Sequence, residues 1–194
     1  MIKSKKEYRY FLECDKVALG KKYKKPRIIG DEIWKFEILM RKAEYYKNCS
    51  KTIFGKILSL YLQYRYYRAR LKLGYSIPLN CFGPGLSIAH YGTIVVNGNA
   101  KIGKNCRIQE CVTIGATNGS KEAPILGDNI FIGSGARIIG NIKIANDIAI
   151  GANAFVNKNF NESGITIAGV PAKKISNNNS HSNLNILLKE KKLL

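Results

Sequence analysis

The sequence contains no long apolar run, only two histidines and no paired cysteines, and each absence excludes a class of protein. A membrane-spanning helix needs about 20 consecutive apolar residues, and no such stretch is present. The N-terminus is charged and lacks the apolar segment of a secretion signal. Two histidines cannot supply a three-histidine zinc site, and none of the five cysteines has metal-ligand or redox spacing. We therefore expect a cytoplasmic protein with reduced thiols and without a metal site.

Acidic residues are also scarce, and the basic residues are unevenly distributed. The 194 residues include 32 Lys and Arg against 13 Asp and Glu, which gives a formal net charge of +19. Residues 1–76 hold 20 of these basic residues, 7 of the acidic ones and ten of the eleven tyrosines. Such a composition fits contact with an anionic surface. We therefore treat residues 1–76 as a segment with its own surroundings.

Residues 1–76 show the periodicity of α-helices. Asp31 is a candidate N-cap, and Gly74 is a candidate stop signal. Apolar side chains at helical spacing predict two faces, made of Ile33, Phe36, Met40 and Ala43, and of Ile53, Ile57, Leu60, Tyr64, Tyr67 and Leu71. Two interpretations remain open. The faces pack against the rest of the protein, or the cationic, tyrosine-rich helix lies on the anionic inner face of a membrane.

Residues 84–156 are a repeat with a period of six. The aliphatic positions are Val96, Ile102, Ile108, Ile114, Leu126, Ile132, Ile138, Ile144, Ile150 and Val156, interrupted at Ser120. A helix has a period of about 3.6 and a plain strand a period of 2, so a period of six favours stacked coils of short strands around an aliphatic column. His90 also falls on the six-residue series, where an aliphatic side chain is expected. Residues 177–194 are predicted to be a polar linker and a C-terminal tail, either a short helix or frayed.

Three segments in this order resemble the hexapeptide-repeat acyltransferases, and among them serine acetyltransferases and capsular or exopolysaccharide O-acetyltransferases. They are "AHYGTIVVNGNAKIG", "CVTIGATNG" followed by "PILGDNIFIGSGARIIGNIKIANDIAIGANAFV", and "ITIAGVPAKKI". The resemblance covers about residues 77–176. It implies a mainly β fold, with a left-handed parallel β-helix at 77–176 after the helical, basic segment 1–76. It also implies acetyl-CoA as acyl donor and a homotrimer with active sites between subunits.

His90 matches the catalytic histidine of these transferases. Moving an acetyl group from a thioester to a hydroxyl requires a base for the hydroxyl proton, and an imidazole ionises near neutral pH. The resemblance leaves the partner of His90 open, because Tyr75 and Ala89 stand where serine acetyltransferases have aspartates. Glu110 is a candidate acid on a neighbouring coil. The alternatives are that Glu110 is an exposed corner residue and that a backbone carbonyl orients the ring.

The acceptor site departs further from serine acetyltransferases. Those enzymes have an Arg-His pair before the proline that reopens the repeat, and Glu122 and Ala123 stand there in this chain. A carboxylate acceptor calls for a cation. We therefore predict a saccharide hydroxyl, in a capsule, exopolysaccharide or related glycan, as the acceptor. The alternatives are serine O-acetylation and a basic protein that uses the β-helix as a scaffold for nucleic acid or membrane, with nucleic acid the least favoured partner.

The donor site is better preserved. By resemblance, CoA lies along a groove where small residues at coil corners admit the pantetheine arm. These positions are Ala116, Ser134, Ala152 and Ala168. Lys173 and Lys174 follow the "GVPA" segment and are candidates for contact with the CoA 3′-phosphate as point charges. The alternative for each is a corner that merely requires a small residue, or a solvated charge.

Overall fold

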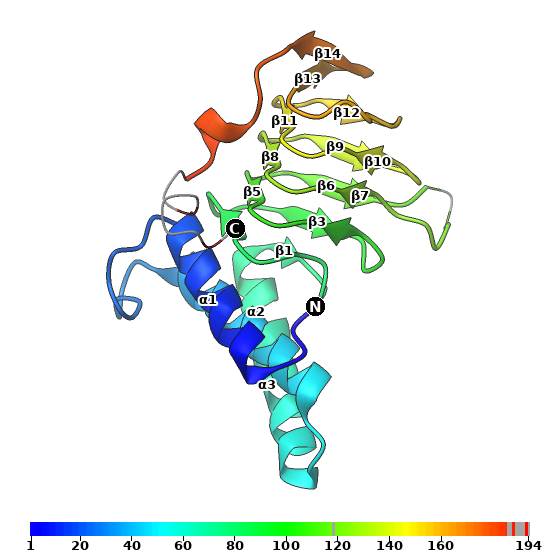
Figure 1. Ribbon diagram of the computed structural model, residues 1–194. Coiled ribbons are helices and arrows are strands. Elements are labelled where there is room, and N and C mark those ends of the chain that lie inside the picture. Colours follow the sequence, from blue (N-terminus) through cyan, green and yellow to red (C-terminus); the bar gives the residue numbers. More distant parts are fainter. Residues whose placement is uncertain (118, 186–187, 189–192, 194) are drawn as a thin grey trace.

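Three helices lie at one end of a stack of short strands (Figure 1) in the computed structural model, which describes residues 1–117, 119–185, 188 and 193. The helices are α1 (Lys5–Ala18), α2 (Glu32–Cys49) and α3 (Ile53–Leu73). The strands are β1 (Tyr75–Ser76), β2 (Ser87–Ile88), β3 (Ile94–Val96), β4 (Lys101–Ile102), β5 (Arg107–Ile108), β6 (Thr113–Gly115), β7 (Ile125–Leu126), β8 (Phe131–Ile132), β9 (Arg137–Ile139), β10 (Lys143–Ile144), β11 (Ala149–Ile150), β12 (Phe155–Val156), β13 (Thr166–Gly169) and β14 (Ala172–Ser176). A short 3₁₀ helix, η1 (His181–Asn183), follows them.

The strands form three sheets, and successive strands of the chain enter the sheets in turn. The orders are β1-β3-β6-β9-β12, β10-β7-β4 and β14-β13-β11-β8-β5-β2. Neighbouring strands run parallel, except that β14 returns antiparallel to β13. The predicted aliphatic column is confirmed, because all ten aliphatic positions of the repeat that follow His90 are buried. Each six-residue unit of the repeat therefore corresponds to one short strand and the corner that follows it.

Asparagine side chains hold one line of corners together. Asn105, Asn129 and Asp147 have φ values of 55°, 58° and 61°, in the left-handed region that Asn and Asp tolerate better than most residues. The Asn105 amide donates to Asn129 Oδ1, and the Asn129 amide donates to Asp147 Oδ1, each over 2.8 Å. Gly103 precedes this corner, and a Cβ there would lie 2.5 Å from the carbonyl oxygen of Gly127. Successive coils can therefore stack only if these corners stay small or polar.

The repeat is longer than six at two places. Ile88 pairs with Ile108, and Val96 pairs with Ile114. The consecutive inward positions Ile88 and Val96 are therefore eight residues apart in the sequence, where the period of six predicted six. The two additional residues lengthen the corner that holds His90, which is exposed. The prediction that His90 occupies an aliphatic position is therefore wrong, because Ile88 fills that place. The break at Ser120 has a similar origin, because β6 ends at Gly115 and β7 begins only at Ile125.

The helices share one hydrophobic cluster with the first coils. The predicted α2 face is confirmed, since Phe36, Met40 and Ala43 are buried in this cluster and Ile33 packs against it. Gly74 ends α3 with φ = 76°, as predicted. Of the two interpretations left open, packing against the rest of the chain does not hold for the α3 face from Ile53 to Leu71, because this face is exposed. Instead α3 buries Leu62 and Tyr66 on its opposite side.

Carboxyl groups of the helices accept hydrogen bonds at the open edge of the six-stranded sheet, next to β2. Asp15 Oδ1 of α1 accepts hydrogen bonds from the backbone N–H of Gly85 and Leu86, over 2.8 and 2.9 Å. Glu37 Oε1 of α2 accepts from the N–H of Ile88 over 3.0 Å. Unpaired N–H groups of an edge strand would otherwise be buried without partners. The helices therefore supply the acceptors that a further coil would have supplied.

Arg41 completes this buried network. Its guanidinium binds Asp15 Oδ2 over 2.7 Å and Glu44 Oε2 over 3.0 Å, and it donates to the carbonyl oxygens of Phe82 and Gly83. All three charged residues are at most 2% exposed. One side chain thus joins both helices to the start of the first coil, a few residues before His90.

The ends of the chain add two observations. Leu188 is buried against Cys14, Val17 and Ala18 of α1, and the Leu193 carbonyl accepts a hydrogen bond from the Tyr10 hydroxyl of the same helix. Most of the predicted tail helix at 184–194 lies outside the described residues. No helix among those described is long and apolar enough to span a bilayer. The division into segments 1–76, 77–176 and 177–194 stays a prediction.

Candidate active site

His90 lies in the lengthened corner between β2 and β3, with its side chain exposed. The hydroxyl of Tyr75 donates to the His90 carbonyl oxygen over 2.9 Å. Burial raises the pKa of Tyr75, so the phenol keeps its proton and remains a donor. Tyr75 therefore holds the backbone of His90, at the position where the resemblance called for a carboxylate.

Glu110, Ser134 and Ala152 follow His90 on the same line of corners, one coil after another. The N–H of Gly135 donates to the Glu110 carbonyl over 3.0 Å, and the N–H of Asn153 donates to the Ser134 carbonyl over 2.8 Å. Glu110 also packs beside the His90 corner, because a Cβ on Gly92 would lie 3.1 Å from the Glu110 Cβ. We call His90, Glu110, Ser134 and Ala152 the corner stack.

The Glu110 carboxylate is held in its ionised form. Its pKa is lowered first by the Ser134 hydroxyl, then by its own backbone N–H, and also by the charge of His90. Its Oε2 atom is buried and has no hydrogen-bond partner among the described residues. Glu110 is therefore not a fully exposed corner residue, and its role as an acid that acts on His90 stays a prediction.

The predicted donor-site residues divide into two groups. Ala168 extends the corner stack, because a Cβ on Gly151 would lie 2.8 Å from the Ala168 Cβ, and Lys173 pairs with Ala168 across the hairpin of β13 and β14. Lys174 is ion-paired with Glu162 over 2.5 Å. Ala116 lies apart from the stack, directly after β6. Ser134, Ala152, Ala168 and Lys173 therefore form one continuous strip above Glu110.

A pocket of about 280 Å³ opens beside His90, between the connection of α1 to α2 and the first coils. Its walls include both chain neighbours of His90, which are Ala89 and Tyr91, together with Trp34, Lys21 and Arg107. Arg107 donates to Ser87 Oγ over 3.3 Å, and no carboxylate of the described residues lies within ion-pair distance of it. Arg107 therefore brings a positive charge without a carboxylate partner to this pocket, which is lined by the chain neighbours of His90 and not by His90 itself.

Lys21 differs from Arg107, because its charge is already matched. Asp31 Oδ1 accepts from Lys21 Nζ over 2.6 Å, and Asp31 Oδ2 accepts from the Arg27 N–H over 2.9 Å. Hydrogen bonds from Lys21 and then Arg27 lower the pKa of Asp31. Asp31 does occupy the N-cap position of α2, as predicted, but its side chain makes no capping hydrogen bond.

Sequence reasoning missed Arg107. The residue occurs on an outward position of β5, as Arg137 does on β9, and both donate to a hydroxyl on the preceding coil of their sheet. Only the packing of the α1–α2 connection against β2 and β5 distinguishes them, because it encloses Arg107 in the pocket. Serine acetyltransferases have an Arg-His pair where this chain has Glu122 and Ala123, so these two positions supply no cation. Glu122 is hydrogen-bonded to Asn141, and Ala123 is buried. Within the described part of the chain, no cluster of three His, Cys, Asp or Glu side chains is placed to hold a metal.

Comparison with known proteins shows what the chain resembles. No family model matches it. Its sequence is 36% identical over 144 residues to the serine acetyltransferase of Buchnera aphidicola subsp. Schizaphis graminum, which covers 70% of this chain and 51% of that protein. It is 38% identical over 95 residues to the Mycobacterium tuberculosis serine acetyltransferase, covering 48% and 41%. The chain thus spans about half the length of the curated relatives it matches.

Solved structures agree. A truncated serine acetyltransferase apoenzyme has a TM-score of 0.66 at 26% identity, with 88% of this chain and 71% of that chain covered. A serine acetyltransferase in complex with CoA has a TM-score of 0.65 at 26% identity, with the same coverage. The enzyme of Brucella abortus strain S19 has a TM-score of 0.66 at 24% identity, covering 91% and 72%.

These findings overturn the prediction of a saccharide acceptor, because the matched proteins are serine acetyltransferases. The prediction treated residues 122 and 123 as the only source of a cation for an acceptor carboxylate. In the folded chain, Arg107 reaches the pocket beside His90 from a different strand. The predicted resemblance to serine acetyltransferases is confirmed in sequence and in structure.

Proposed function

We propose that this chain is an acetyl-CoA-dependent serine O-acetyltransferase with His90 as general base. The observation that carries the proposal is the identity of 36–38% to serine acetyltransferases. The solved relative in complex with CoA supports the same donor. The finer implications of the resemblance belong to this proposal: the coil is a left-handed β-helix, and the enzyme is a homotrimer with its active sites between subunits.

His90 moves one proton in this reaction. The imidazole takes the proton of the serine hydroxyl as its oxygen attacks the thioester carbon. The carbon–sulfur bond then breaks, and the imidazolium returns the proton to the CoA sulfur. The carboxylate of Glu110 stabilises the positive charge that His90 carries between these two steps. The strip from Ser134 to Ala168 admits the pantetheine arm close to the backbone, with Ala116 at a second corner, and Lys173 and Lys174 contact the 3′-phosphate.

Serine is distinguished from a neutral alcohol by its carboxylate, and we assign Arg107 to bind it. A guanidinium forms strong, directional bonds to carboxylates. The test of the proposed function is a thiol-release assay with acetyl-CoA and a panel of serine, other hydroxy amino acids and neutral alcohols. We expect release with serine, and mass spectrometry should show O-acetylserine. Release with neutral alcohols but not with serine would refute the proposal.

Replacing Arg107 with Ala is expected to raise the KM for serine about 10- to 100-fold with a smaller change in kcat, since a hydrogen bond to a charged group contributes about 1.5–3 kcal/mol. Arg137→Ala is the matched control, because Arg137 makes the equivalent hydroxyl contact on another sheet, away from the pocket. Steady-state kinetics with varied serine measure both. Equal effects of the two substitutions would remove Arg107 from the acceptor site.

Replacing Glu110 with Gln is expected to lower kcat about tenfold, the effect of about 1.4 kcal/mol of lost charge stabilisation. The KM values for serine and acetyl-CoA should change less than kcat, because the carboxylate acts on the charge that His90 carries during the reaction and not on substrate binding. Glu122→Gln is the control, because the Glu122 carboxylate lies between β6 and β7 and accepts a hydrogen bond from the Asn141 amide. A kcat unchanged by Glu110→Gln would show that Glu110 only shapes the corner.

A further inference from the structure

The exposed face of α3 is a large feature that the proposed reaction does not use. Its apolar and tyrosine side chains recur three or four residues apart, with Phe54 and Tyr61 as additional neighbours, which places them along one side of a helix. These residues, here called the α3 stripe, are Ile53, Phe54, Ile57, Leu60, Tyr61, Tyr64, Tyr67 and Leu71. Each is at least 50% exposed, and Phe54 is 86% exposed. Contiguous apolar surface of this kind indicates an interaction site.

The α3 stripe is held outward by the packing of the other side of the helix. Leu62 and Tyr66 are buried there, and the Tyr66 hydroxyl donates to the carbonyl of Ile77 over 2.7 Å. The Tyr66 ring also stacks on Phe36 at 5.3 Å. The orientation of the stripe is therefore a fixed property of the fold. Figure 1 shows α3 extending away from the coils.

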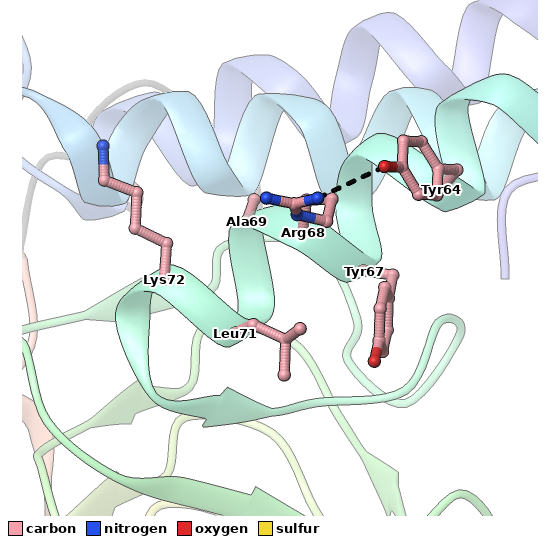
Figure 2. Close-up of a pocket in the computed structure, with 6 residues that line it drawn as sticks. All are labelled: Tyr64, Tyr67, Arg68, Ala69, Leu71 and Lys72. Atoms are coloured by element: carbon pink, nitrogen blue, oxygen red, sulfur yellow. Dashed lines mark hydrogen bonds between the residues drawn. The ribbon is translucent and has the colours of Figure 1, made fainter.

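Cations border the α3 stripe, and α3 contains no acidic residue. The bordering basic residues are Lys56, Arg65, Arg68 and Lys72, whereas the fifth, Arg70, lies over the ring of the buried Tyr66. Figure 2 shows Arg68, hydrogen-bonded to the Tyr64 hydroxyl over 3.3 Å, and Lys72 on the same helix as Tyr67 and Leu71. These residues line an open hollow of about 780 Å³. Apolar anchors, phenol groups and cations thus lie together on one surface.

The charge of α3 decides between the occupants of this surface. A second copy of the chain would set the four bordering cations of one α3 against those of another, with no carboxylate on either helix to match them. An anionic bilayer supplies phosphates for the cations and acyl chains for the apolar side chains, while tyrosine suits the boundary between them. We propose that the α3 stripe docks the protein on an anionic membrane surface. Acetyl transfer plays no part in this inference.

Flotation of the purified full chain with vesicles tests the proposal. We expect binding to vesicles of phosphatidylcholine mixed with phosphatidylglycerol, and none to phosphatidylcholine alone. Raising the ionic strength from about 0.01 M to about 1 M shortens the Debye length from about 30 Å to about 3 Å and should weaken the binding. Each engaged cation contributes about a fivefold factor, so Arg65→Gln/Arg68→Gln/Lys72→Gln should weaken binding about a hundredfold. Ile57→Gln/Leu60→Gln/Tyr64→Gln should abolish it.

The matched control is Lys22→Gln/Lys24→Gln/Lys25→Gln, which removes three exposed cations from the α1–α2 connection. Vesicle binding by this variant should stay close to that of the unmodified chain. Equal loss in the control would overturn the proposal, because attraction would then follow net charge alone. So would the absence of vesicle binding at low salt, or a change of oligomeric state in light scattering caused by the apolar variant. DNA binding of the same proteins is measured in parallel. If Ile57→Gln/Leu60→Gln/Tyr64→Gln loses DNA binding but keeps vesicle binding, the surface binds nucleic acid and the membrane proposal is overturned.

Discussion

Replacing His90 with Ala is expected to lower turnover about 10²- to 10⁴-fold, the usual contribution of a general base. The side chain is exposed in a corner whose backbone is held by Tyr75, so the substitution removes the imidazole without opening the core. The thermal melting temperature and the affinity for CoA should therefore change little. Thiol-release kinetics measure the turnover, and calorimetric titration with CoA measures the affinity for CoA.

His181→Ala is the control for this experiment, since the chain has no third histidine. His181 lies beyond the coils, where its Nε2 contacts Asp147 Oδ1 over 2.7 Å. The control should keep normal turnover. If His90→Ala also keeps near-normal turnover, His90 is not the base. A loss of CoA affinity as large as the loss of turnover would instead assign His90 to donor binding.

Replacing Arg41 with Ala is expected to lower the free energy of unfolding by about 3–5 kcal/mol, the cost of removing one partner of a buried ion pair. The substitution leaves Asp15 and Glu44 as buried carboxylates without a cation, and it frees the carbonyl oxygens of Phe82 and Gly83. Urea denaturation measures the change. Arg41→Lys tests the same point if the alanine variant does not fold, because a lysine keeps the charge but loses the planar fork. A change below about 1 kcal/mol for both variants would contradict the structural role of the network.

Glu37→Gln is the isosteric comparison in the same network, because an amide oxygen can still accept from the Ile88 N–H. Burial, and then the charge of Asp15, raise the pKa of Glu37 well above its ordinary value. The folded state therefore holds a proton that the unfolded chain releases as the pH rises past about 4.5. Stability of the unmodified chain should fall above that pH until the folded state also releases the proton. The Glu37→Gln variant has no such proton to release. Its melting temperature, measured at increasing pH, should therefore fall less than that of the unmodified chain.

The period of six was sufficient to predict the coil. An aliphatic residue every sixth place, with small residues between, can be buried only if the chain turns a corner after each short strand. The ten positions of this series from Val96 to Val156 are all buried, as the spacing within this segment alone predicts. Gly74 as a helix stop and the buried α2 face were predictable for the same reason, because each depends on local spacing and on the conformation of one residue.

The position of His90 in the fold could not be predicted from the spacing of the repeat. A count of six places it on an inward position, but strand pairing makes Ile88 the inward residue and puts His90 in a corner of greater length. Where a repeat is lengthened depends on which coils pair, and that is decided by contacts between distant residues. Glu110 illustrates the same limit, since a single acidic residue on a corner means nothing until its coil stacks on the coil of His90.

The sequence by itself determined the coil, its aliphatic column, the helix ends and the resemblance that singles out His90, because each of these depends on residues near one another in the chain. The tertiary structure decided which face of α3 is buried, and it brought Arg107 into a pocket with Ala89 and Trp34. Both faces of α3 are apolar, so periodicity could not choose between them. Arg107 and Arg137 are equivalent in pattern, and only the helical segment packed over one of them makes a site. Long-range packing selects among surfaces that local patterns leave equal.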